Sequence, residues 1–123
     1  MIEAIAAAKA FRVPLDLLLA LCSVESRLTN AINWYDGGSP SIGVCQMKVR
    51  TVRDLGYSPS DLFNYERAFM AAAAYLRAQK DRYQTWPAAV VAYNRGSYRR
   101  TMSTKYLTKV LRARRLIKAR PTS

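Results

Sequence analysis

The sequence predicts a single, mainly α-helical domain, and three observations support this prediction. Half of the residues are apolar, which excludes a disordered chain. The length of 123 residues allows one hydrophobic core but not two. Signals that start or stop helices, such as Pro14, Gly56 and Asn64, recur along the chain. No repeat or linker-like stretch divides residues 1–123, so we expect one compact domain.

The same signals define the expected helices. The alanine-rich stretch 2–12 ends before Pro14, whose fixed φ suits the first turn of a second helix that runs to Ser26. Residues 27–43 hold Asn, Asp, Gly, Ser and Pro, and we expect a long loop there. Further helices are expected at about 44–55, 58–61, 64–83, 87–94 and 103–118. The residues that share one side of the last helix are Tyr106, Val110, Arg114 and Ile117.

The composition excludes several kinds of chemistry. The chain has no histidine, which rules out a Ser–His or Cys–His pair and a histidine-based metal site. Two cysteines, Cys22 and Cys45, are too few for a zinc site or a disulfide framework. They are either two buried small apolar residues or one bridge, because sequence cannot give their separation. Carboxylates, tyrosines, serines and amides remain for chemistry.

The N-terminal stretch does not have the pattern of a signal peptide. Glu3 precedes any positive charge, Lys9 and Arg12 interrupt the apolar region, and Pro14 follows. No run of about 18 apolar residues is present either, so a membrane span is not expected. The chain is expected to be made without an export signal or to be a domain cut from a longer protein.

The charge is strongly positive and unevenly distributed. The formal net charge is +12, and residues 82–123 contain 11 Lys or Arg and no Asp or Glu. Such a surface indicates a polyanionic partner, and nucleic acid, an anionic lipid surface and a bacterial cell-wall polymer all qualify.

One carboxylate stands out by its position. Glu25 lies at the end of the very apolar second helix, next to Leu21, Cys22 and Leu28. Burial raises the pKa of a carboxyl group, and a carboxyl that keeps its proton near neutral pH can act as a general acid. Alone, a glutamate at a helix end is more often simply solvated.

Four short motifs follow one another in the chain: Glu25–Ser26, "GVCQM" at 43–47, "AYNRG" at 92–96 and "YLTKVL" at 106–111. Their order and spacing resemble the soluble lytic transglycosylase family and its goose-type lysozyme relatives, over about residues 14–111. The departures, at Val44, Cys45 and Leu107, keep apolar character. The resemblance implies a lysozyme-like fold, the catalytic domain of a lytic transglycosylase.

The resemblance also implies a sugar-binding cleft and its residues. Glu25 would be the catalytic carboxyl, and the hydroxyl of Tyr106 would point at it. Segment 39–48 would form one wall, in which Gly43 allows close approach and Gln46 offers amide hydrogen bonds. The residues that would bind or position the substrate are Ser26, Ser41, Gln46, Met47, Tyr93, Asn94 and Tyr106.

The implied reaction needs one carboxyl. Glu25 would protonate the oxygen of the β-1,4 bond between N-acetylmuramic acid (MurNAc) and N-acetylglucosamine (GlcNAc). It would then accept the proton of the MurNAc 6-hydroxyl, which attacks its own anomeric carbon and forms a 1,6-anhydro ring. Because the substrate supplies the nucleophile, we expect no metal or cofactor and no second carboxylate.

A hydrolytic lysozyme is the alternative within the same fold. A hydrolase needs a second carboxylate to activate water, and Asp36 falls close to an aspartate of the goose-type enzymes. Asp36 also begins an Asp-Gly-Gly stretch, which is ordinary turn chemistry. Where those enzymes have a second aspartate, this chain has Lys48, a cation that favours the non-hydrolytic route.

The expected partner is peptidoglycan, and the basic C-terminal half would hold a monomeric enzyme on the anionic cell wall. A basic helical module that binds nucleic acid through residues 99–120 is a distant alternative, and no specific nucleic acid is expected. The missing export signal suits a bacteriophage lysis or virion protein, or an excised bacterial domain.

Overall fold

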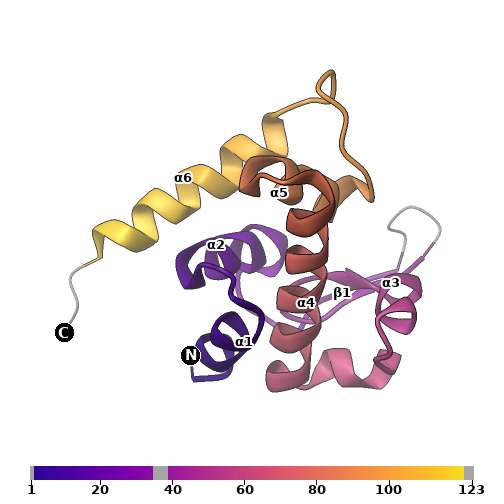
Figure 1. Ribbon diagram of the computed structural model, residues 1–123. Coiled ribbons are helices and arrows are strands. Elements are labelled where there is room, and N and C mark those ends of the chain that lie inside the picture. The colour runs from indigo at the N-terminus through magenta and orange to yellow at the C-terminus, as the bar shows by residue number, and fades with distance from the viewer. Residues whose placement is uncertain (1, 35–38, 121–123) are drawn as a thin grey trace.

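The computed structural model describes residues 2–34 and 39–120 and is mainly helical, as the sequence predicted (Figure 1). The six α-helices of this part are α1 (Ile2–Phe11), α2 (Leu15–Ser26), α3 (Val49–Asp54), α4 (Tyr65–Tyr83), α5 (Trp86–Arg95) and α6 (Lys105–Ala119). A 3-10 helix, η1 (Pro59–Phe63), and three short strands, β1 (Ile32–Asn33), β2 (Ser41–Ile42) and β3 (Met47–Lys48), complete it. None of the described helices is both long and apolar enough to cross a membrane.

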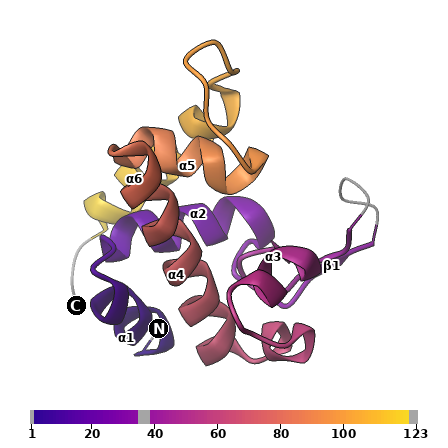
Figure 2. The same cartoon turned by 45° about the vertical axis from the view of Figure 1, so that its right-hand side comes forward.

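Helix α4 runs through the middle of the molecule (Figure 2). It packs against α1 and α5, while α2 packs against α6 and α1. Buried alanines at 71–73 let neighbouring helices approach α4, and Phe69 and Leu76 of the same helix fill the core. The packing of α2 against α6 matters most for the site, because it brings the last helix to the end of the second.

The helix starts predicted from the sequence are confirmed at two caps. Ser58 and Asp61 form a capping box at η1, in which the Ser58 side chain accepts a hydrogen bond from the backbone of Ser60. The side chain of Asn64 accepts one from the Arg67 backbone N–H at 3.0 Å and so starts α4. On α6, the side that carries Tyr106 and Val110 faces the protein, as expected.

The prediction of a helix over 44–55 is wrong at its start. Residues 43–46 form a turn and 47–48 a strand, so that α3 begins only at Val49. The turn is closed because the backbone N–H of Gly43 donates to the carbonyl of Ala31 at 2.8 Å and that of Gln46 donates to the Gly43 carbonyl at 3.1 Å. The stretch predicted as a loop, 27–43, likewise contains β1 and β2, and the sheet is antiparallel in the order β1-β2-β3.

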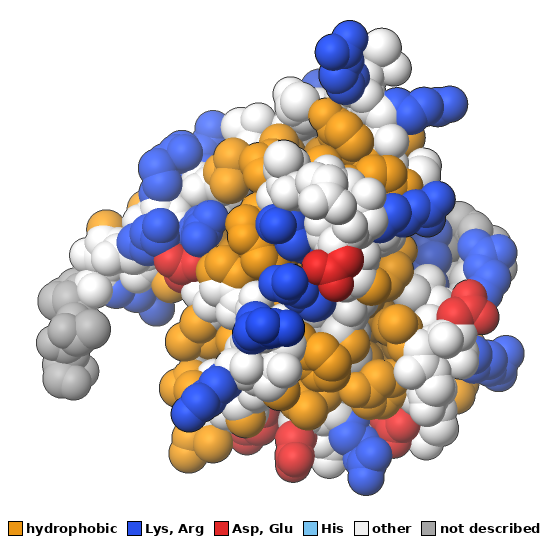
Figure 3. Space-filling model, viewed as in Figure 1, with side chains coloured by type: hydrophobic (Ala, Val, Ile, Leu, Met, Phe, Trp, Pro, Cys, Tyr) orange, Lys and Arg blue, Asp and Glu red, His pale blue; other side chains and the backbone are white. Residues whose placement is uncertain are grey.

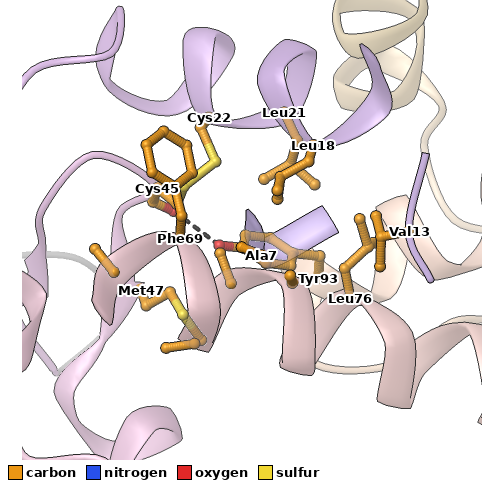
Figure 4. Close-up of a cluster of buried hydrophobic side chains, with 14 of the residues drawn as sticks. Ala7, Val13, Leu18, Leu21, Cys22, Cys45, Met47, Phe69, Leu76 and Tyr93 are labelled. Carbon is orange, nitrogen blue, oxygen red and sulfur yellow. Dashed lines mark hydrogen bonds between the residues drawn. A yellow bond between two sulfur atoms is a disulfide. The ribbon is translucent and has the colours of Figure 1, made fainter. Parts of the chain in front are cut away.

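A disulfide joins Cys22 of α2 to Cys45 of the turn, which decides between the two readings of the cysteine pair (Figure 4). Both residues are almost fully buried, and Phe69 and Leu21 lie in the same apolar cluster. The hydroxyl of Tyr93 on α5 donates to the carbonyl oxygen of Cys45 at 2.9 Å. The turn is therefore tied to α2 by a covalent bond and to α5 by a hydrogen bond.

Gly43 is the point of closest approach between the turn and η1. Its φ is +89°, and a Cβ atom at this position would lie 2.2 Å from the carbonyl oxygen of Leu62. That distance is far inside van der Waals contact, and backbone cannot move aside as a side chain can. Only glycine fits here.

We predict that Gly43→Ala destabilises the fold far more than Gly56→Ala, its matched control. Gly56 has a similar φ of +86° but nothing within 4 Å of an added Cβ. Its substitution should therefore cost only the left-handed strain, about 1–2 kcal/mol. At Gly43 the overlap with Leu62 adds about 1–3 kcal/mol. Urea unfolding of both variants measures the difference, and equal losses would show that the close approach is absent.

We predict that removing the disulfide with Cys22→Ala/Cys45→Ala lowers the free energy of unfolding by about 2–4 kcal/mol, since the bridge limits the unfolded chain. Urea unfolding with and without a reducing agent tests this. The reductant should lower the midpoint of the parent protein and leave that of the double variant unchanged. Two titratable thiols in the unreduced, denatured parent would contradict the bridge.

Candidate active site

The end of α2 places Glu25 beside the last helix. Helix α2 terminates at Arg27, which has a left-handed φ of 56°, so Glu25 lies in its final turn. Because α2 packs against α6, the hydroxyl of Tyr106 reaches this carboxylate and donates a hydrogen bond to Glu25 Oε1 at 2.6 Å. The contact between Tyr106 and Glu25 that the sequence implied is present.

Tyr106 is suited to remain a donor. Burial raises the pKa of its hydroxyl well above the ordinary value of 10, and the negative charge of Glu25 and the hydrogen bond to it raise the pKa further. The phenol therefore stays protonated through neutral and mildly alkaline pH. It can hold one oxygen of the Glu25 carboxylate in a fixed place.

Tyr93 has a different task, although it lies in the same cleft. Its ring packs against Tyr75 of α4 with centroids 5.2 Å apart, and its hydroxyl is bonded to the Cys45 carbonyl. Burial raises the pKa of Tyr93 well above 10, and the charge of Glu25 adds to this. Tyr93 thus fixes the Gly43–Gln46 turn against α5 as a neutral group.

A cleft opens in front of Glu25. One wall is the segment from the turn into α3, at residues 46–48 and 50–51, and the other is Tyr75 with the end of α5, at residues 93–96. Glu25 is the only carboxylate among the described residues that line it. The lining also includes three cations, Lys48, Arg50 and Arg95.

Most of the residues singled out in the sequence meet here. Glu25, Gln46, Met47, Tyr93 and Asn94 line the cleft, and Tyr106, which is not among its lining residues, contacts Glu25. Asp36, the candidate second carboxylate, lies outside the described residues.

Ser26 and Ser41 do not line the cleft. The hydroxyl of Ser26 is within hydrogen-bonding reach of the carbonyl oxygens of Val44 and Cys22, and it accepts a bond from the Thr29 N–H. Ser41 is fully buried on β2. Ser26 therefore joins α2 to the turn, and the role of Ser26 and Ser41 in positioning a substrate stays a prediction.

Gln46 lines the cleft, but its amide nitrogen is used inside the protein. Nε2 donates to the carbonyl of Ala31 at 2.7 Å and to that of Gly43 at 2.9 Å. These two bonds hold the residue at its left-handed φ of 49° and brace the turn. Only the carbonyl oxygen of the side chain is left to accept a hydrogen bond from a bound molecule.

Three lining residues, Tyr75, Arg50 and Thr51, belong to none of the four sequence motifs, and Arg95 and Gly96 stand in the motif at 92–96 without a role assigned to them. Tyr75 belongs to no motif, and its one signal is a tyrosine among the alanines of a long helix. Burial raises its pKa above 10, so it faces the cleft as a neutral group. Both arginines were counted toward the net charge. The motif at 92–96 places Arg95 near the cleft, whereas no signal in the sequence places Arg50 beside Glu25.

The arrangement is suited to proton transfer. A single half-buried carboxyl group faces a cleft, and a neutral tyrosine that is not among the lining residues of the cleft donates a hydrogen bond to it. No group of three or more His, Cys, Asp or Glu residues in the described part is placed to hold a metal ion. The chemistry available is that of one acid/base group with amide and cationic neighbours.

Comparison with known proteins agrees with this geometry. The family model described as "Transglycosylase SLT domain" matches residues 3–112, nearly the whole chain. No curated protein and no solved structure was found to match. The match confirms the resemblance inferred from the motifs and the lysozyme-like helical fold that it implied. The chain belongs to the transglycosylase SLT domain family, and this membership supports a peptidoglycan-cleaving activity.

Proposed function

We propose that this protein is a lytic transglycosylase that breaks the β-1,4 bond between MurNAc and GlcNAc and leaves 1,6-anhydro-MurNAc ends. The observation that carries the proposal is the pair of Glu25 and Tyr106, a carboxylate oriented at 2.6 Å in a cleft that has no other described carboxylate. The family membership supports the substrate, and the geometry of the cleft supports the choice of catalytic group.

In the proposed reaction Glu25 acts twice. As an acid it protonates the bridging oxygen while the bond to the MurNAc anomeric carbon breaks, which leaves an oxocarbenium-like centre. The resulting carboxylate then takes the proton of the MurNAc 6-hydroxyl as that oxygen bonds to the anomeric carbon. The proton count closes, and no water is consumed. Tyr106 holds the carboxyl in place, and Tyr93 keeps the opposing turn in position.

The cations of the cleft favour this route over hydrolysis. Lys48, at the position where goose-type lysozymes have an aspartate, lines the cleft together with Arg50. A protonated lysine cannot accept a proton from water, whereas hydrolysis needs a base on the face opposite the acid. The product analysis below would distinguish a lysozyme that uses Asp36 as the base that activates water.

The basic last helix supports a role in holding the enzyme on its substrate layer. Asp16 of α2 pairs with Arg114 at 2.9 Å and with Lys118 at 3.5 Å, so these two cations serve the packing of α6 on α2. Arg112 and Arg115 are exposed on the same helix and are available to anionic wall polymers. Lys and Arg side chains lie along α6 and over the top of the molecule in the space-filling view (Figure 3). The cell wall is the place of action that we propose.

We predict that digestion of purified peptidoglycan in oxygen-18 water gives anhydro ends without label, and that Glu25→Gln lowers this cleavage by several orders of magnitude. Removal of the only proton donor affects the transition state rather than the binding of substrate, so wall binding should persist. Mass spectrometry of the released fragments measures both the label and the rate.

Glu66→Gln is the matched control, since it makes the same acid-to-amide change at an exposed carboxyl of α4 and should leave the rate unchanged. Labelled reducing ends that disappear on Asp36→Asn would make the protein a lysozyme. Activity of Glu25→Gln above a tenth of the parent would remove Glu25 from the mechanism.

We predict that Tyr106→Phe lowers kcat about tenfold to hundredfold and leaves KM and the melting temperature nearly unchanged. The change removes one hydrogen bond to a charged group, worth about 1.5–3 kcal/mol, and keeps the ring that packs against α2. Tyr98→Phe removes a hydroxyl from a ring that packs against Tyr83 outside the cleft, and it serves as the control. A lower melting temperature with unchanged kcat would reduce Tyr106 to a core residue.

A further inference from the structure

The Cys22–Cys45 bridge lies where the two sides of the cleft meet. Cys22 precedes Glu25 by about one turn of α2, and Glu25 lines the cleft. Cys45 directly precedes Gln46, which lines the cleft as well. Without the bridge, the proposed catalytic carboxyl and this wall of the cleft are joined through the chain only by the long segment 26–45.

Hydrogen bonds alone would hold the turn if the bridge were opened. The hydroxyl of Ser26 donates to the carbonyl oxygen of Val44, and the hydroxyl of Tyr93 donates to that of Cys45 at 2.9 Å. A single hydrogen bond contributes less to stability than a typical disulfide does, and thermal motion breaks it and lets it form again. The turn would therefore be held less firmly against Glu25.

The reduced form cannot keep the geometry of the bridged form. Cys22 and Cys45 are 0% and 1% exposed, and Phe69 and Leu21 lie in the same apolar cluster (Figure 4). Two sulfur atoms that are no longer bonded must separate to van der Waals contact, which displaces their neighbours in a close-packed core. Helix α2 is packed against α1 and α6, so the displacement falls mainly on the turn.

A displacement there changes the cleft without unfolding the chain. The packing of α4 against α1 and α5, and of α2 against α6, does not use the bridge. A disulfide supplies only part of the stability of a domain of this size. By contrast, a shift of about 1 Å in an active site can lower a rate about a hundredfold. Reduction should therefore cost activity while the fold is kept.

We propose that the Cys22–Cys45 pair is a redox switch of the cleft: the disulfide form cleaves, and the dithiol form is folded but has little activity. This inference rests on the proposed function and adds a control to it. A dithiol reductant supplies two electrons and two protons, the bond between the sulfurs breaks, both cysteines become thiols, and the reductant closes to its own disulfide. A disulfide oxidant reverses the step. The chain has no other cysteine, so no other pairing competes.

The switch would keep the enzyme latent where proteins are synthesised. Reductants of the cytosol keep thiols reduced, whereas disulfides form and persist outside it. The dithiol form is therefore the one that belongs to the cytosol, and the bridged form belongs to the cell wall, the place of action proposed above. Cleavage would begin only after the chain has reached its substrate.

The test compares the two redox forms of the parent protein, refolded from urea with a dithiol reductant or with a disulfide oxidant. The rate of fragment release from purified peptidoglycan should be about tenfold to hundredfold lower for the reduced form. The reduced form should keep its near-UV circular dichroism and a cooperative urea transition. Reoxidation of the same sample should restore the rate.

Two variants separate the switch from other effects of the reductant. Cys22→Ala/Cys45→Ala cannot form the bridge, so it should show the low rate of the reduced parent under both conditions. Gly56→Ala is destabilised for a reason that lies outside the cleft, the positive φ of +86° at that position. In its oxidised form it should therefore keep the rate of the oxidised parent, although it is less stable.

Each other outcome has a definite meaning. Equal rates for the two forms of the parent, or a double variant as active as the oxidised parent, overturn the switch and leave the proposed function intact. The switch also falls if the double variant still responds to the reductant, because the effect then lies elsewhere. Loss of cooperative unfolding in the reduced parent, or a low rate of oxidised Gly56→Ala, overturns it too, since the rate would then follow stability. Absence of cleavage by the oxidised parent overturns the proposed function itself.

Discussion

The attachment of the Gly43–Gln46 turn to the end of α2 is the constraint on which the rest of the site depends. The Cys22–Cys45 bridge makes this attachment covalent, and it lies one helical turn before Glu25. Ser26, directly after Glu25, bonds to the carbonyl of Val44 in the same turn. Glu25, the proposed catalytic carboxyl, and the opposing wall of the cleft are thus fixed to each other through neighbouring residues, and the remaining helices are placed around that unit.

The contacts of the turn leave little room for substitution. Gly43 has no room for a Cβ atom against Leu62, and the amide of Gln46 is engaged with two backbone carbonyls. Tyr93 of α5 donates a hydrogen bond from its hydroxyl to the carbonyl oxygen of Cys45. A disulfide persists where cytosolic reductants are absent, which agrees with an enzyme that acts on the cell wall.

The sequence predicted the helices well where propensity and caps agreed, and failed where tertiary contacts decided. The capping residues Ser58 and Asn64 are local signals and were correct. The region 41–48 forms strands of two residues, which are too short to leave an alternating pattern, and its apolar run was assigned to a helix instead. The turn there depends on the hydrogen bond from Gly43 to Ala31, which is distant in the chain, and on the left-handed conformation of Gln46. Hydrophobic periodicity reports neither feature.

The candidate site shows the same division. The order of the motifs, through the family resemblance, predicted that Glu25, Gln46, Tyr93 and Tyr106 belong to one site. It also implied the contact between Tyr106 and Glu25 that the structure shows. Arg50 had no such signal, because it belongs to no motif and approaches Glu25 only in the fold, whereas Arg95 lies within the motif at 92–96 at a position that the family pattern leaves open. The disulfide was undecidable for the same reason, since sequence spacing alone gives no separation in space.

The charge of the cleft acts on both halves of the proposed reaction. The oxocarbenium-like centre is positive, so Lys48, Arg50 and Arg95 in the lining oppose its formation. The carboxylate that Glu25 becomes on losing its proton is one compensating charge, and Tyr106 holds it near that centre. The orientation of this one carboxylate by Tyr106 therefore matters more in a cationic cleft than it would in a neutral one.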